Sequence, residues 1–561
     1  MHVIIRALRR LRREERGITL LLTLFVLTVT TFAVAGTYVA VVGDSQLSRN
    51  DLDQQRAYSA AQAGIAAYTY QLNQDANYWE QCNSLPSNAA SGGQSAVPNS
   101  TDGGSTEYYS VTPLVASTST SSTCDPTNAL ATMIEGPSLA SGAANPAGGT
   151  FRISSTGTSN NVSRTIVAQY KRQSFLNFVY YTDYETLDPV TLYNPNSNPT
   201  EPTDCARHYP NRGSDCAGPI DFLSGDQING PLHSEDTLAI CGTSSSGPSF
   251  GRSGSYDDAI EAAGVSTESG FSGQSNCVLK YTVNPGGNSI NTHASSLTPP
   301  PTNAQLLQIA QQDGYVFTGV THIKLSGTNM TVTNANLSGG AETVAFPDNG
   351  VVYVKTATSG CSTVYTPYTA NSAYTADATP ATATCGNVYV SGSYTSSLTI
   401  ASDNDVIIDG NITTTGYPGT PTGTQLLGLI ANDFVRIYHP VGTRSISDCN
   451  NANNSSGTID GNSYPLSNIY IYAAILAVNH SFIVDNYDCG SPLGTLHVEG
   501  AIAQLFRGTV GTFSNGSINS GYLKDYVYND ELADIEPPYF LNPVSAAWTV
   551  QRLTECDAAS C

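Results

Sequence analysis

Residues 17–42 read GITLLLTLFVLTVTTFAVAGTYVAVV, and this stretch decides how the fold begins. The twenty-five residues from Ile18 to Val42 carry no charge. As a helix rising about 1.5 Å per residue, they would cross a hydrocarbon core of about 30 Å. A cleaved secretory signal would have a shorter apolar region. The sequence therefore predicts one membrane-spanning helix.

The charged residues are distributed unevenly around this span. Six of the 23 basic residues fall within the first sixteen positions, whereas the 561-residue chain carries 45 acidic residues and a formal charge of −22. Basic residues before the span and a long acidic remainder after it predict a cytoplasmic N-terminus and a body outside the membrane. The acidic body also argues against a nucleic-acid partner.

Helical periodicity continues beyond the apolar stretch. Ala57, Ala61 and Gly64 recur at helical spacing on one face, and no proline occurs between residues 18 and 74. We therefore expect one continuous helix over residues 18–74. Its front half would be apolar and its back half amphipathic.

The residues around this helix resemble a known family. Glu15-Arg16-Gly17-Ile18 ahead of the apolar run is similar to the leader junction of type IV pilins and pseudopilins, where prepilin peptidase cuts after the glycine. The stretch Gln55-Arg-Ala-Tyr-Ser-Ala-Ala-Gln-Ala-Gly64 is similar to the post-membrane motif of PilX-type minor pilins. A strand-turn-strand pattern over residues 151–157 and 164–170 resembles the small pilin sheet.

The resemblance covers about residues 1–172 and carries expectations for the chain. It implies processing between Gly17 and Ile18 by prepilin peptidase. It also implies single-pass insertion in a bacterial cytoplasmic membrane, followed by association with other pilin or pseudopilin subunits at the cell surface or in a pilus. The alternative is a signal-anchor helix that holds an exported domain without any filament.

One position departs from the family pattern. Major pilins carry Glu at the fifth mature position, and this chain has Leu22 there. An intramembrane Glu needs a partner in a packed filament, and Leu22 cannot take that role. The resemblance therefore implies a minor or tip subunit whose helix assembles through Leu22, Arg56, Ala57, Ala61 and Gly64.

From about residue 220 the sequence consists of short apolar runs separated by Gly, Asn and Asp. The runs 351–354, 397–400 and 469–477 are examples. Recurrence about every 8 to 12 residues, with small polar residues at the turns, favours a right-handed parallel β-helix, or β-solenoid. A β-sandwich or another mixed β domain is the alternative. The apolar run 473–477 is typical of a strand buried on both faces.

The whole chain is thus predicted to be mainly β with a long N-terminal α-helix. A single further helix is expected after Thr302, ending before Gly314. The predicted parts are a basic leader (1–17), the membrane and amphipathic helix (18–74), a small pilin-like β region (75–172), a linker (173–219), a β-solenoid-like domain (220–515) and a C-terminal cap (516–561).

Twelve cysteines, all beyond the apolar span, suggest disulfides in an exported protein. No C-x-x-C spacing exists to favour a metal or redox site. Pairing between neighbours along the chain would close local loops, although the sequence alone does not fix the connectivity. The candidate pairs are Cys82 with Cys124, Cys205 with Cys216, Cys241 with Cys277, Cys361 with Cys385, Cys449 with Cys489, and Cys556 with Cys561.

One acidic cluster invites a chemical interpretation. Asp403, Asp405 and Asp409 could share one strand face, where paired carboxylates can act as acid and base or bind Ca²⁺. Asp403 and Asp405 also flank an asparagine, which is typical of a turn. The turn interpretation is preferred, with Asp403 and Asp405 kept as weak calcium candidates. No H-E-x-x-H, phosphate-loop or dinucleotide-binding motif occurs, and no cofactor is expected.

The predicted function is display rather than bond chemistry. A minor-pilin-like helix would carry a disulfide-stapled β domain outside the cell for adhesion, tip capping or filament priming, with a host or surface ligand as possible partner. The alternatives are a surface-tethered β-helix enzyme that acts on polysaccharide and a purely structural envelope protein.

Overall fold

The computed structural model describes most of the chain. The described residues are 2–87, 92–98, 106–116, 119, 121–127, 129–134, 150–192, 205–209, 211–213, 216, 220–266, 277–285, 289–357, 361, 384–439, 457–459, 462–464, 466–514, 517–544, 546 and 548–556. Only the backbone is described at 2–18, 40–47, 130–131, 457–459, 462–464, 514 and 517.

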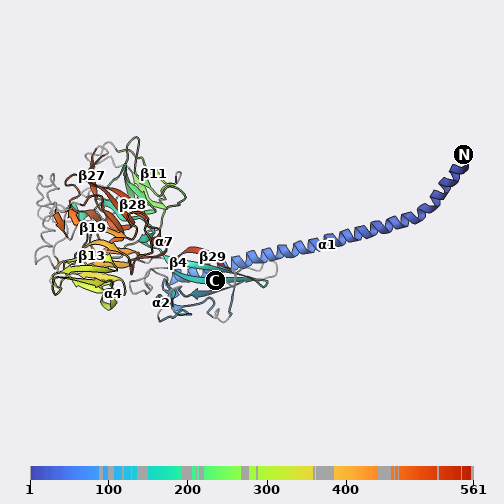
Figure 1. Ribbon diagram of the computed structural model, residues 1–561, viewed down its shortest axis with the longest axis horizontal. Coiled ribbons are helices and arrows are strands. Elements are labelled where there is room, and N and C mark those ends of the chain that lie inside the picture. Colours follow the sequence, from blue (N-terminus) through green and yellow to red (C-terminus); the bar gives the residue numbers. More distant parts are fainter. Residues whose placement is uncertain are drawn as a thin grey trace.

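Helix α1 (His2–Gln74) dominates the outline of the molecule. It runs for 73 residues, which at about 1.5 Å per residue makes it roughly 110 Å long. The helix covers the predicted range 18–74 and begins earlier, within the basic leader. Figure 1 shows its N-terminal part projecting away from a β-rich body.

The C-terminal part of α1 packs on a small antiparallel sheet. Its strand order is β1, β2, β3, β4, β29. The predicted hairpin is present as β3 and β4, which pair in register from Thr150 with Lys171 to Ser159 with Val162. The bounds are β1 (Ser95–Ala96), β2 (Tyr108–Leu114), β3 (Thr150–Ser159), β4 (Val162–Arg172) and β29 (Trp548–Cys556).

The remaining body is built mainly of parallel strands. Ladder 1 is a continuous parallel sheet of nine strands in the spatial order β12, β16, β18, β20, β24, β26, β5, β8, β10. The bounds are β12 (Tyr315–Thr318), β16 (Val351–Lys355), β18 (Leu398–Ser402), β20 (Leu427–Ala431), β24 (Tyr470–Ala477), β26 (Pro492–Arg507), β5 (Tyr180–Leu187), β8 (Leu232–Cys241) and β10 (Ile260–Ser266).

Two further parallel ladders accompany the first. Ladder 2 joins β13, β17, β19, β21 and β25. Ladder 3 joins β19, β24, β26, β28, β7, β9 and β11. The new bounds are β13 (Thr321–Gly327), β17 (Val388–Tyr394), β19 (Val406–Thr414), β21 (Val435–Ile437), β25 (Phe482–Val484), β28 (Ser517–Tyr528), β7 (Gln227–Asn229), β9 (Ser249–Phe250) and β11 (Thr282–Val283).

The other elements are short and decorate this framework. The hairpin of β14 and β15 extends β13 in antiparallel fashion. The expected helix after Thr302 is α4, which begins three residues later, at Gln305. The bounds are η1 (Tyr78–Gln81), α2 (Ala129–Met133), η3 (Phe175–Asn177), α3 (Pro189–Leu192), β6 (Phe222–Leu223), α4 (Gln305–Asp313), β14 (Asn329–Asn334), β15 (Ala341–Ala345), β22 (Gly457–Ile459), β23 (Asn462–Tyr464), β27 (Gly511–Ser514) and α7 (Glu531–Asp534).

The parallel stack does not follow the order of the sequence. The first strand of ladder 1 along the chain, β5, lies in the middle, paired on one side with β8 and on the other with β26. The chain leaves β5 through β8 and β10, crosses to the opposite end, and returns strand by strand from β12 to β26. The last strand of the stack therefore docks on the first.

The crossing segment, residues 289–304, covers part of ladder 1. Beside β5, the Tyr181 hydroxyl donates to the carbonyl oxygen of Leu297 at 2.6 Å. Beside β18, the Asn303 amide donates to the carbonyl oxygen of Ser402 at 2.7 Å. A later segment near Phe540 covers Gly428 of β20. The middle strands β18, β20 and β24 of ladder 1 are thus buried on both faces, which explains the continuous apolar run of β24.

The chain end does not lie where the sequence suggested. The range 516–561 was expected to cap the β-solenoid-like domain. Instead β28 is a member of ladder 3, and β29 pairs with β4 in the small antiparallel sheet. The large β domain is therefore inserted between two neighbouring strands of the small sheet (Figure 1). Long-range strand pairing of this kind leaves no local signal in the sequence.

The mainly β character with a long N-terminal helix is confirmed. Two apolar cores follow from the two sheets: a large one between the ladders and a small one between α1 and the antiparallel sheet. A sandwich of the common antiparallel kind would not have ladders that are parallel over so many strands.

Candidate functional site

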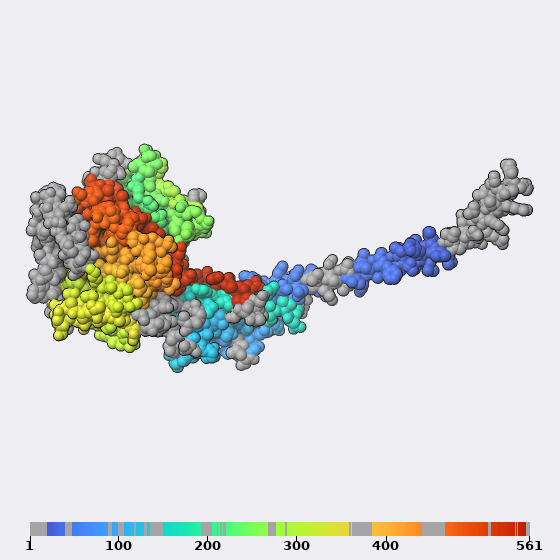
Figure 2. All heavy atoms as spheres, viewed as in Figure 1, coloured from blue at the N-terminus to red at the C-terminus, as the bar shows by residue number. Residues whose placement is uncertain are grey.

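The N-terminal part of α1 is the first functional element. The helix from Thr19 to Val39 is long and apolar enough to cross a membrane, and none of it is buried by the rest of the chain. Leu22 lies in this segment with 61% of its surface exposed. In Figure 2 the segment stands clear of the body. Gly17 and Ile18 lie in the helix backbone, and their side chains are outside the described residues.

The C-terminal part of α1 is occupied by the chain's own sheet. Ala57 and Ala61 are fully buried, and a methyl group on Gly157 of β3 would lie 2.0 Å from the carbonyl oxygen of Ala57. The Ser155 hydroxyl donates to the carbonyl oxygen of Ala61 at 2.7 Å. A methyl group on Gly64 would collide with the Ser155 hydroxyl oxygen at 2.3 Å. These small residues allow the helix to approach the strand closely.

Arg56 differs from the three small residues around it. Its guanidinium lies 3.8 Å from the carboxylate of Glu107, just before β2, and its side chain is about one-quarter exposed. Of the five residues predicted for assembly between subunits, the structure therefore leaves Leu22 facing outward. It uses Ala57, Ala61 and Gly64 inside the molecule.

Two side chains beside the junctions with the inserted domain make long-range hydrogen bonds. The ammonium of Lys171, at the end of β4, is buried and donates to the carbonyl oxygens of Leu532 and Ala533. Burial lowers the pKa of Lys171. At the start of β29, the Trp548 indole donates to the carbonyl oxygen of Ala76, two residues after α1, at 2.7 Å.

Four of the six predicted disulfides are present between neighbouring cysteines along the chain, which confirms local stapling for these pairs. Cys489 and Cys556 are also disulfide-bonded, and their expected partners, Cys449 and Cys561, lie outside the described residues. The four bonds join Cys82 to Cys124, Cys205 to Cys216, Cys241 to Cys277, and Cys361 to Cys385.

The carboxylate of Asp403 braces a turn. It accepts from the Tyr353 hydroxyl at 2.5 Å and from the backbone amide of Thr356 at 2.6 Å. Those two donors already engage both of its oxygens. The turn interpretation of the sequence agrees with this geometry.

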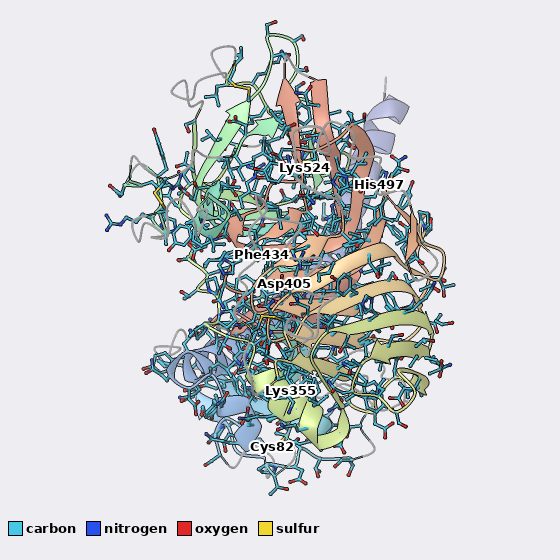
Figure 3. All side chains as sticks on the ribbon, turned by 90° about the vertical axis from the view of Figure 1, so that its left-hand side faces the viewer. Cys82, Lys355, Asp405, Phe434, His497 and Lys524 are labelled. Atoms are coloured by element: carbon cyan, nitrogen blue, oxygen red, sulfur yellow. A yellow bond between two sulfur atoms is a disulfide. The ribbon has the colours of Figure 1, made fainter. Side chains whose placement is uncertain are left out.

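The carboxylate of Asp405 lies in a buried charge cluster. It accepts from the Arg436 guanidinium at 2.9 Å and from the backbone amide of Phe434 at 3.0 Å, while Asp485 lies 3.2 Å from the other side of the same guanidinium. Figure 3 shows Asp405 and Phe434 in the middle of the stack. A carboxylate already neutralised by a buried arginine is poorly suited to hold Ca²⁺. Arg436 was not among the residues predicted from the sequence, because burial of a lone arginine has no sequence signal.

Asp409 lies on β19 with little exposure and lines a cavity of about 100 Å³ together with His322, Lys324 and Ser391. It does not share a cluster with Asp403 and Asp405. Among the described residues, one group of acidic and cysteine side chains comes close enough for a metal: Asp221, Cys241 and Cys277. The two cysteines form a disulfide, so they offer no thiolates to a metal.

The chain thus combines an exposed apolar helix, long enough to span a membrane, with a mainly β body that carries disulfides. No protein-family model matches the sequence. No curated protein matches it either. Among solved structures, it is similar to the competence-associated pilin ComZ from Thermus thermophilus, with 11% identity, 90% of this chain and 97% of that chain covered, and a TM-score of 0.27. A TM-score of this size carries no argument, so the function has to be inferred from the chain's own geometry.

Proposed function

We propose that the chain is a minor-pilin-like protein that displays a right-handed β-solenoid outside the cell. The observation that carries the proposal is the division of α1. Residues 19–39 are apolar and bare, whereas Ala57 and Ala61 of the same helix are buried on the antiparallel sheet. An exposed apolar segment that continues into a packed segment of the same helix is suited to insertion in a membrane, followed by association with the helices of other subunits.

The β-solenoid part of the proposal is supported by the three parallel ladders. In a solenoid each strand pairs with the equivalent strands of the coils on either side. Ladders 1, 2 and 3 contain such pairing: β20 belongs to ladder 1, β21 to ladder 2, and β24 to ladders 1 and 3. The domain would then serve as a rigid body for adhesion, tip capping or filament priming, without catalysis.

Leu22 supports a position at the end of a filament rather than along it. A subunit with Glu at this place could pair with the free N-terminal amine of a neighbour inside the membrane or filament. Leu22 offers no such acceptor, so this subunit would be present in few copies.

The proposal is tested in the organism that makes the protein. N-terminal sequencing should find mature chains that begin at Ile18, and Gly17→Arg should block that processing. Quantitative mass spectrometry of sheared filaments should find the chain as a minor component. A mature chain that retains Met1, or a chain abundant in membranes and absent from filaments, would instead favour a simple anchored domain. Glycan cleavage by the purified protein would contradict the absence of catalysis.

A further inference from the structure

The outward face of ladder 3 carries two regular rows of side chains. In the first row Tyr470 of β24, His497 of β26, Asp525 of β28 and Gln227 of β7 stand at the same register. Neighbouring strands are about 4.8 Å apart, so the row spaces its side chains evenly across four strands. Figure 3 shows His497 toward the side of the stack.

Contacts between neighbours hold the first row in place. The Tyr470 ring stacks on the His497 ring, with centroids 4.5 Å apart and an interplanar angle of 6°. The His497 Nδ1 lies 2.8 Å from the Asp525 carboxylate, whose other oxygen accepts from the Asn229 amide at 3.3 Å. The Tyr417 ring lies across the end of the row, 6.1 Å from Tyr470. These side chains are half-buried, and their positions are set before any ligand arrives.

Glu499 stands in the second row, beside the first. It is paired in register with Tyr472 of β24 and Val527 of β28. Within the described part of the chain its carboxylate receives no hydrogen bond, and neither it nor Asp525 is paired with a lysine or arginine. Burial, and then the charges of Asp530 and Asp525, raise the pKa of Glu499 to about 7. A half-buried carboxylate without a donor gains from a ligand that donates hydrogen bonds.

The ladder 3 face is less covered than ladder 1 over the residues that the structure describes. Ladder 1 is covered by the chain's own crossing segment, whereas Tyr470, His497 and Asp525 of ladder 3 stay partly exposed. The ladder 3 rows combine tyrosine and histidine rings with carboxylate and amide groups at constant spacing. Aromatic rings pack against apolar C–H surfaces, while carboxylates and amides bind hydroxyl groups.

We propose that the ladder 3 face, with Tyr470, His497, Glu499 and Asp525 as its central residues, binds a neutral polysaccharide. A sugar polymer supplies both the hydroxyl donors and the C–H surfaces that these side chains fit. An anionic polymer would be repelled by the carboxylate of Glu499, which has no basic partner among the described residues, and by a chain of formal charge −22. This inference names a ligand class for the proposed display function. It rests on that function only for the location of the protein outside the cell.

The binding test uses the full chain in a detergent without a sugar headgroup. Titration calorimetry is run with hexasaccharides of four neutral polymers, namely cellulose, mannan, xylan and chitin, and with oligogalacturonate as the anionic probe. We expect at least one neutral probe to bind and oligogalacturonate not to bind. Glu499→Gln and Tyr470→Ala should each weaken binding about tenfold or more. The control variant Tyr209→Ala removes a tyrosine of 42% exposure elsewhere in the protein and should leave affinity unchanged.

A pH series distinguishes direct ligand binding by Glu499 from a purely structural role of this residue, because a structural role would not make affinity depend on its ionisation. The ionised carboxylate of Glu499 accepts hydrogen bonds from hydroxyl groups more strongly than the neutral acid does, so affinity should rise as the pH passes through about 7. The other titratable groups near Glu499 are Asp525, Asp530, Tyr394, Tyr417 and Tyr472, together with His497, two residues away on the same face of β26. In Glu499→Gln the rise should disappear, while circular dichroism should show an unchanged fold.

Several results would overturn the inference. They are no binding of any neutral hexasaccharide at millimolar concentration, preferential binding of oligogalacturonate, or binding that Glu499→Gln and Tyr470→Ala leave intact. Because the assay uses purified protein, its failure is distinguishable from failure of the filament proposal, which is decided by processing and by the composition of sheared filaments.

Discussion

Replacing Gly157 with alanine would test the contact between α1 and the small sheet. The new methyl carbon would lie 2.0 Å from the carbonyl oxygen of Ala57 and 2.3 Å from the backbone nitrogen of Ala61. Both are backbone atoms of a regular helix and cannot turn aside, so the strand and the helix must separate by about 1 Å to reach normal contact. That separation would also stretch the 2.7 Å hydrogen bond from Ser155 to Ala61.

The cost follows from these two effects. Overpacking of this kind costs about 1–3 kcal/mol, and a lost hydrogen bond adds about 1 kcal/mol. We therefore expect Gly157→Ala to lower the free energy of unfolding of the small module by about 2–4 kcal/mol. The control is Ser154→Ala, three residues earlier on β3 at a half-buried position, which should change it by less than about 0.5 kcal/mol.

The assay uses the two tryptophans of the chain, which both lie in the small module. The Trp79 ring stacks on Phe151 at 5.6 Å, and the Trp548 ring meets the same ring edge-on at 4.7 Å. Tryptophan fluorescence during urea unfolding of the full chain in detergent therefore reports this module and not the large β domain. An unfolding midpoint of Gly157→Ala equal to that of the parent protein would refute the reasoning.

Two further predictions concern the buried charges of the large domain. Arg436→Leu would leave Asp405 and Asp485 buried without their cation, and should cost about 3–5 kcal/mol of stability by calorimetry. Burial, and then the charge of Asp405, raise the pKa of Asp433 to about 6, although His480 opposes the shift. Because folding raises the pKa of this carboxyl group, the free energy of unfolding falls as the pH rises from about 4 to 6. Asp433→Asn should therefore raise the melting temperature at pH 7. That gain should be lost below pH 4.

Each of these predictions has its own control. Arg552→Leu changes an exposed arginine of β29 and should alter stability by less than about 0.5 kcal/mol. A loss of similar size in Arg552→Leu and Arg436→Leu would contradict the role assigned to the buried pair. For Asp433→Asn, a melting-temperature gain that is constant from pH 4 to pH 8 would show that ionisation is not its cause.

Local patterns predicted local structure well. The uncharged run after Gly17 and the spacing of Ala57 and Ala61 predicted α1, because helix formation depends on residues three and four apart. The hairpin of β3 and β4 followed from alternation around a short turn. The disulfides between neighbouring cysteines were also predictable, since short loops bring their ends together readily.

Long-range arrangement was not predictable in the same way. The pairing of β29 with β4 joins positions nearly four hundred residues apart, and nothing in either strand specifies its partner. The docking of β26 on β5 has the same character. The carboxylates at Asp403 and Asp405 were visible as a cluster. Only the fold shows that Tyr353 and Arg436 already engage them.

Insertion of the large domain between β4 and β29 has a mechanical consequence. The domain leaves from Arg172 and returns at Trp548, which are paired across the two strands. A force that pulls the domain away from the N-terminal part of α1 would load both strands from the same end and in the same direction. The rungs between β4 and β29 would then carry little of that tension. The tension would instead act as shear on the hydrogen bonds between β3 and β4 and on the contact of Gly157 with α1. Many bonds must break together there. A domain attached in this way could be pulled by a surface to which it binds without β4 and β29 separating one hydrogen bond at a time.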